Sequence, residues 1–105
     1  MRILVFNVTG QKLQPDKNCD FTGIVAGSKG YLSARFNFSK DWIGCKKVAV
    51  FIGANGECPV GLINNTCEIP AEALTSGAVR VYVIGRRPGF EISTDRTMFT
   101  QNTYR

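Results

Sequence analysis

The segment Tyr31–Phe38 shows the strictest alternation in the chain, and this alternation constrains the fold more than any other feature. Apolar residues occupy every second position from Leu32 to Phe38, and the positions between them are mostly polar. A period of two places successive side chains on opposite faces of a strand, so one face is buried and the other meets water. Strands of this kind are typical of antiparallel sheets.

Short runs of strand-forming residues, separated by turn signals, make up most of the remaining chain. Lys47–Gly53 is almost entirely apolar, which indicates a central strand covered on both faces. Asn55-Gly56 follows it and predicts a hairpin. In Ala78–Gly85 the valines share one face, and Gln11–Asp20 is either a loop or a weak edge strand. We expect the other strands at Ile3–Val8, Phe21–Ala26, Cys58–Ile63, Thr66–Ile69, Phe90–Ser93 and Met98–Thr103.

Two single helical turns are expected between strands. One begins at Ser39, and the other runs from Pro70 to Leu74, because proline suits the first helical position. Seven to nine short strands at this spacing fit an all-β antiparallel β-sandwich or a small barrel. The 105 residues correspond to one domain, residues 1–105. We expect no membrane span, since the sequence lacks an apolar run of about 18 residues.

The residues that usually carry reaction chemistry are scarce. The chain has no histidine, which is the commonest general base and metal ligand. Its eight carboxylates fall mostly in predicted turns, where such groups are usually solvated. The glycine-rich segment Gly23–Gly30 lacks both the Gly-Lys-Ser/Thr ending of a phosphate loop and the helix that should follow it. We therefore expect no enzymatic activity, no cofactor and no metal site.

Four cysteines, Cys19, Cys45, Cys58 and Cys67, form no Cys-x-x-Cys pair. Their spacing does not suit a structural zinc site. We expect mostly buried free thiols, and one disulfide is the alternative.

The net charge of +5 permits an anionic partner such as nucleic acid. Lys46-Lys47 and Arg86-Arg87 are the only adjacent basic pairs, and neither is interleaved with aromatic residues spaced for base stacking. We therefore expect a solvated basic surface and no nucleic acid partner.

Trp42 is the single tryptophan and lies at a predicted turn between two strands. We expect it to plug one end of the core beside Phe38 and Phe51, with Ile43 folding back onto the same end. The alternative is an exposed platform for a ligand.

Two pairs of residues are candidate partner contacts. Arg86 and Arg87 lie at a predicted hairpin tip, where they can hold a carboxylate or phosphate of a partner. The alternative is that both arginine side chains are only solvated and contact no partner. Tyr104 and Arg105 end the sequence, and a terminal arm there can pair with the sheet edge of a neighbouring subunit.

Three segments together resemble small virion proteins of phages that infect Gram-positive bacteria. Phe36–Gly44 followed by Lys47–Phe51 resembles a strand, an acidic-Trp-x-Gly turn and a second strand of that family. Cys67–Leu74 is similar to the family's Cys-x-Ile-Pro-x-Glu-x-Leu segment, and Val79–Gly85 is similar to the strand that follows. The resemblance extends from Tyr31 to about Asp95.

This resemblance implies an immunoglobulin-like sandwich of the kind found in baseplate, tail-fibre-attachment and head-fibre proteins. It implies a structural component of a bacteriophage virion and offers no catalytic residues to transfer. We predict an adaptor or attachment module in the tail, baseplate or fibre assembly, located in the virion. Its partners would be other virion proteins, with the chain present as a homo-oligomer or in many copies. The alternatives are a capsid decoration or head-fibre anchor protein, and a basic module that inhibits a host protein or binds nucleic acid.

Overall fold

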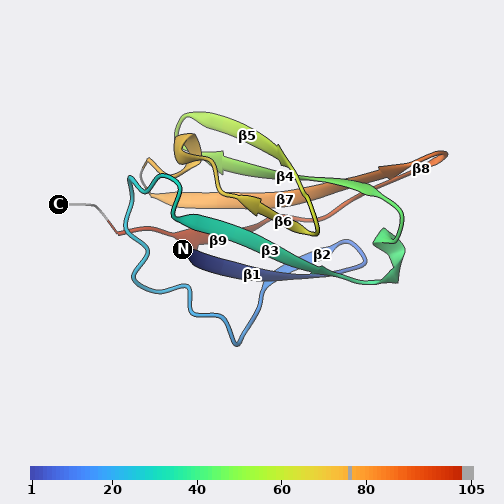
Figure 1. Cartoon of the computed structure of the whole chain (residues 1–105), viewed down its shortest axis with the longest axis horizontal. Helices are drawn as coiled ribbons and strands as arrows, with labels where there is room; N and C mark the ends of the chain where they lie inside the picture. Colours follow the sequence, from blue (N-terminus) through green and yellow to red (C-terminus); the bar gives the residue numbers. More distant parts are fainter. Residues whose placement is uncertain (76, 103–105) are drawn as a thin grey trace.

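The computed structural model describes residues 1–75 and 77–102, which form two β-sheets that pack face to face (Figure 1). Two 3-10 turns, η1 (Lys40–Trp42) and η2 (Ala71–Ala73), interrupt the strands. The strands are β1 (Arg2–Thr9), β2 (Lys12–Pro15), β3 (Leu32–Phe38), β4 (Lys46–Gly53), β5 (Gly56–Gly61), β6 (Thr66–Glu68), β7 (Ala78–Arg87), β8 (Phe90–Ser93) and β9 (Thr97–Thr100). This architecture confirms the all-β sandwich and both helical turns.

The first sheet has the strand order β2-β1-β3-β6, and the second has the order β5-β4-β7-β8. β9 pairs with β7 beyond β8, so these two short strands line one long edge of β7. Every pair is antiparallel except β1 and β3, which run parallel. The prediction of an antiparallel sandwich misses this pair. It arises because residues 16–31 carry the chain back to the start of β1, where Arg2 N donates to Tyr31 O at 2.8 Å.

The predicted strand at Phe21–Ala26 is wrong, because this segment belongs to the loop between β2 and β3. It makes one isolated bridge, between Val25 and Asn102. Gly23 has φ +68°, which departs from an extended strand. The side chain of Asp20 accepts hydrogen bonds from Thr22 N at 2.8 Å and from its hydroxyl at 2.6 Å, forming a local turn. The last expected strand is shorter than predicted and is β9, while residue 103 lies outside the described residues.

The core lies between the sheets and follows the predicted alternation. Phe36 is buried on β3, and its ring stacks on that of Phe6 of β1 at 5.2 Å. In β7, Val79, Val81 and Val83 are fully buried, as the sequence predicts. No polar or charged residue is buried within residues 1–75 and 77–102. Apolar contact therefore joins the two sheets.

One side of the sandwich is closed by hydrogen bonds between the sheets. The segment between β8 and β9 carries Asp95, whose Oδ1 accepts from Leu13 N of β2 at 2.8 Å. Asp95 N donates to Gln11 O at 2.8 Å. These contacts satisfy a donor and an acceptor at the β2 edge. β2 lies within Gln11–Asp20, for which a weak edge strand is one of the two predictions.

The edge strand β5 carries a proline where its backbone faces outward. Leu62, the residue after β5, donates its N–H to Lys47 O of β4 at 2.9 Å. Every second residue back along β5 from Leu62 therefore turns its N–H group toward β4. Pro59 has the opposite parity and lies where an N–H would point to the free edge. Because proline has no such donor, it weakens this edge as a template for an added strand.

Candidate functional site

Trp42 closes one end of the core. It is fully buried, its ring centroid is 5.1 Å from that of Phe38, and its Nε1 donates to Gly10 O at 2.8 Å. Phe51 is also fully buried in the same core cluster. The prediction that Trp42 is a core plug is confirmed, and the exposed platform is wrong. Ile43 is 72% exposed, so the expectation that it folds onto the core is wrong as well.

Arg87 is held by the protein itself and fastens the β7–β8 hairpin to η1. Its Nη1 donates to Asp41 O and Ile43 O, both at 3.1 Å, and lies 3.4 Å from Cys45 Sγ. Its guanidinium carbon is 3.7 Å from the centroid of the Phe90 ring. These contacts hold the guanidinium group through its Nη1 atom and its face, so Arg87 positions the hairpin.

Arg86 points the other way and remains exposed. It forms an ion pair with Glu91 at 3.3 Å, and both side chains are more than half exposed. Of the predicted partner contacts within the described residues, Arg86 is therefore the one whose charged group is exposed, and it is paired with Glu91. Tyr104 and Arg105 lie outside the described residues.

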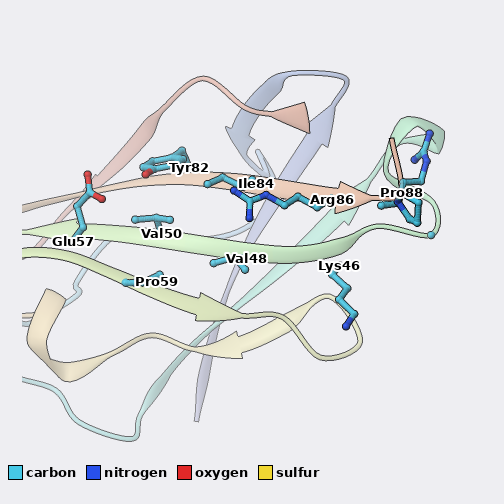
Figure 2. A pocket seen from close by; sticks show the side chains of 11 residues that line it. Lys46, Val48, Val50, Glu57, Pro59, Tyr82, Ile84, Arg86 and Pro88 are labelled. Carbon is cyan, nitrogen blue, oxygen red and sulfur yellow. The ribbon is translucent and has the colours of Figure 1, made fainter. Parts of the chain in front are cut away.

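The outer face of the second sheet, meaning the side turned away from the core, forms an apolar groove (Figure 2). Val48 and Val50 of β4 lie beside Tyr82 and Ile84 of β7, and Pro59 of β5 adds to the floor. The groove has a volume of about 770 Å³. Sheet faces that meet only water usually carry polar residues, so this outer face marks a candidate binding surface.

The sequence predicts that the central strand is covered on both faces, and the structure contradicts this for the outer face. No helix or strand lies over it within the residues that the structure describes. Val50 is only 4% exposed because its neighbours on the face shield it, whereas Val48 and Ile84 are half-buried. The apolar run of Lys47–Gly53 is the sequence signal for this face, but no part of the described chain covers it.

The outer face of the first sheet differs in character. Asn37 Nδ2 donates to Asn7 Oδ1 at 3.0 Å, and Asn7 Nδ2 donates to Asp16 Oδ2 at 3.2 Å. Val5 has Arg35 as its neighbour across the strands. Polar groups thus interrupt the apolar residues here, and the contrast singles out the second sheet.

Basic residues lie at both ends of the groove. At one end Lys46 and Arg86 are direct cross-strand neighbours on the outer face. At the other end Arg80 lies between Ile52 and Met98, and Arg96 has its guanidinium carbon 5.0 Å from the Tyr82 ring centroid. Like charges placed directly opposite each other destabilise a sheet, so the Lys46–Arg86 pair favours an added anion.

Fewer carboxylates than basic residues lie near the groove. Glu91 is paired with Arg86, and Glu57 lies on β5 across from Ile52. Figure 2 shows Glu57 and Lys46 at opposite ends, with the apolar floor between them. The outer face therefore carries a net positive charge.

The four cysteines are free thiols and are half-buried, so they are less enclosed than predicted. Burial raises the pKa of the Cys67 thiol to about 11. Burial, with a smaller contribution from the Glu72 charge, also raises the pKa of Cys58. A thiol with a raised pKa is a poor nucleophile at neutral pH. No group of three or more metal-ligating side chains comes together in residues 1–75 and 77–102.

Comparison with known protein families, with curated proteins and with solved structures finds no match to this chain. Among the described residues, no helix has the length and apolarity needed to cross a membrane. The sequence and the geometry of the outer face are therefore the basis for a functional proposal.

Proposed function

We propose that this protein is a non-catalytic structural component of a bacteriophage virion, an adaptor or attachment module in the tail, baseplate or fibre assembly. It docks to other virion proteins through the outer face of its second sheet. The observation that carries the proposal is the uncovered apolar groove on that face. The virion setting rests on the resemblance of Phe36–Gly44, Lys47–Phe51 and Cys67–Leu74 to small phage proteins.

The face supports docking better than the β2 and β5 edges do. A hollow lined mainly by apolar side chains offers a place where side chains of a partner can be buried. Pro59 removes an outward donor from the β5 edge, and Asp95 occupies groups of the β2 edge. Pairing through added strands, which the sequence alone suggests, therefore lacks an open donor at one position of each of these two strands.

The proposal is tested in purified particles of the phage that encodes the chain. We expect mass spectrometry to detect the protein in the particles and labelled electron microscopy to locate it on the tail or fibre assembly. Labelling of the capsid would instead support a decoration or head-fibre anchor protein. Absence from intact particles would overturn the virion proposal altogether.

A matched pair of variants tests the face. Ile84→Glu places a charge in the groove, and Arg35→Glu places one on the outer face of the first sheet. Both positions are on strands, and the thermal midpoint of each purified variant shows whether it folds. We expect particles to exclude Ile84→Glu and to incorporate Arg35→Glu. Equal incorporation of the two folded variants would show that docking uses another surface.

A further inference from the structure

We infer that the segment that docks on the outer face is acidic: an apolar stretch of another virion protein with a carboxylate at each end. This inference rests on the proposed function and adds the chemistry of the partner. It follows from the cations around the apolar floor, from the aliphatic side chains that form the floor, and from the proline in the neighbouring edge strand β5.

The floor suits aliphatic side chains and not stacked bases. Val48, Val50, Pro59 and Ile84 form most of it. The single aromatic ring of the floor, that of Tyr82, already has the Arg96 guanidinium over it. Single-stranded nucleic acids need open aromatic rings on which successive bases stack. The floor thus favours a protein segment with apolar side chains.

The cations set the spacing of the expected carboxylates. Arg80 and Arg86 are exposed on the same face of β7 and are six positions apart. Because a strand rises by about 3.3 Å per residue, their Cα atoms are about 20 Å apart. Lys46 joins Arg86 at one end, and Arg96 joins Arg80 at the other, where both line a second hollow with Met98. A carboxylate at each end would therefore meet two cations, of which Arg86 is also paired with Glu91.

A second copy of the chain does not fit this charge pattern. Each end of the face holds two of the cations just described and one carboxylate, which is Glu91 at one end and Glu57 at the other. Both ends are therefore basic, and any face-to-face pairing of two copies brings a basic end against a basic end. Such pairing costs free energy in either orientation. An acidic partner gains free energy at both ends.

The segment lies across the face and does not extend the sheet. Pro59 withholds an outward N–H at the β5 edge, so the backbone of a partner finds a poor template there. An extended segment of about six residues spans the distance between the two cationic ends. A helix of about 13 residues covers the same distance.

A displayed library of random peptides, selected on the immobilised full chain at low salt, tests the inference. We expect the enriched peptides to carry Asp or Glu on both sides of an apolar stretch. Binding of the best peptide is then measured by fluorescence polarisation on folded variants. We expect Arg80→Glu and Arg86→Glu each to weaken it by about tenfold. The control Arg35→Glu makes the same charge change on the opposite sheet and should leave it within about twofold.

Several results would overturn the inference. The enriched peptides could lack carboxylates and yet bind the wild type and not the Ile84→Glu variant. That result would support the docking face and refute its preference for acidic segments. Peptides insensitive to Ile84→Glu, or a library without enrichment, would refute the docking face itself. A dimer in sedimentation that Ile84→Glu dissociates would identify a second copy as the occupant. A labelled single-stranded oligonucleotide whose binding weakens in Arg80→Glu would identify nucleic acid. Virion proteomics tests the proposed function separately from all of these.

Discussion

Gly85→Ala tests whether the Trp42 plug is packed to its limit. A Cβ at position 85 would lie 2.7 Å from both Cε3 and Cζ3 of Trp42 and 3.3 Å from the Cβ of Cys45. Carbon atoms prefer separations of about 3.5–4.0 Å, so the indole would have to move by almost 1 Å. Trp42 has little room to move, because it is fully buried and its Nε1 donates a hydrogen bond to Gly10 O.

The expected loss of stability follows from these contacts. Overpacking of a core costs about 1–3 kcal/mol, and displacement of the indole also weakens a hydrogen bond worth about 1 kcal/mol. Replacing glycine restricts the unfolded chain and returns about 0.4–1 kcal/mol. We therefore expect Gly85→Ala to lower the free energy of unfolding by about 2 kcal/mol. With a urea dependence of about 1–1.5 kcal/mol/M, the urea concentration at the unfolding midpoint falls by about 1.3–2 M.

Urea unfolding followed by the fluorescence of Trp42, the only tryptophan, measures this change. Gly61→Ala is the control, because a Cβ there meets no atom within 4 Å. We expect it to stay within about 0.5 kcal/mol of the wild type. In a Trp42→Leu background, followed by circular dichroism, Gly85→Ala should lose most of its cost, giving a coupling energy of about 1–2 kcal/mol. Equal stability of the two alanine variants, or a cost unchanged without the indole, would refute the packing argument.

Three further predictions concern other parts of the fold. Gly53→Ala should destabilise at least as much as Gly85→Ala in the same urea assay, because its Cβ would lie 2.6 Å from the backbone oxygen of Ala73; a loss below about 0.5 kcal/mol would contradict this. Burial raises the pKa of Cys67 from 9.0 to about 11, so its contribution to stability is complete below pH 9.0 and declines as pH rises toward 11. The difference between wild type and Cys67→Ala in pH-dependent unfolding should therefore change across this range, and a constant difference would refute the assignment. Pro59→Val supplies the missing edge donor and should cause concentration-dependent association in analytical ultracentrifugation, whereas sedimentation identical to the wild type would count against an edge blocked by proline.

Features set by neighbouring residues could be predicted from the sequence. The alternation in Leu32–Phe38 and the valines of β7 identify their buried faces because side-chain direction in a strand depends only on position. Asn64 and Asn65 have φ of +53° and +62°, a backbone conformation that asparagine tolerates in turns. The Trp42 plug follows from apolar residues on both sides of a short turn.

Features set by distant segments could not be predicted in the same way. The residues Phe21–Ala26 have strand-forming side chains, but positive φ at Gly23 and the turn around Asp20 prevail. The parallel pairing of β1 with β3 depends on the path of the loop between β2 and β3, about which local pattern says nothing. Pairing between strands is a tertiary property, and propensity does not specify it.

The groove shows a further limit of sequence patterns. Lys47–Gly53 is almost entirely apolar, which predicts that both faces of the strand are covered. The described residues cover only the face that lies in the core. The pattern does not distinguish a cover supplied by the same chain from one supplied by a partner, because the transfer of a valine out of water is the same in both cases. Here the described chain covers one face, and the proposed docking would cover the other.

The size of the groove bears on how such a partner is held. Its floor has four half-exposed or exposed side chains, Val48, Pro59, Tyr82 and Ile84, and covering them stabilises a complex by about 1 kcal/mol each. Association costs at least about 4 kcal/mol, so the apolar floor alone gives weak binding. In the proposed docking, the cations at both ends would therefore have to contribute, and a single copy would bind only modestly. In a particle that carries many copies, linked contacts raise the overall affinity by about 10² or more without any new contact. Weak single contacts of this kind agree with the proposed role as a building block that is repeated in a particle.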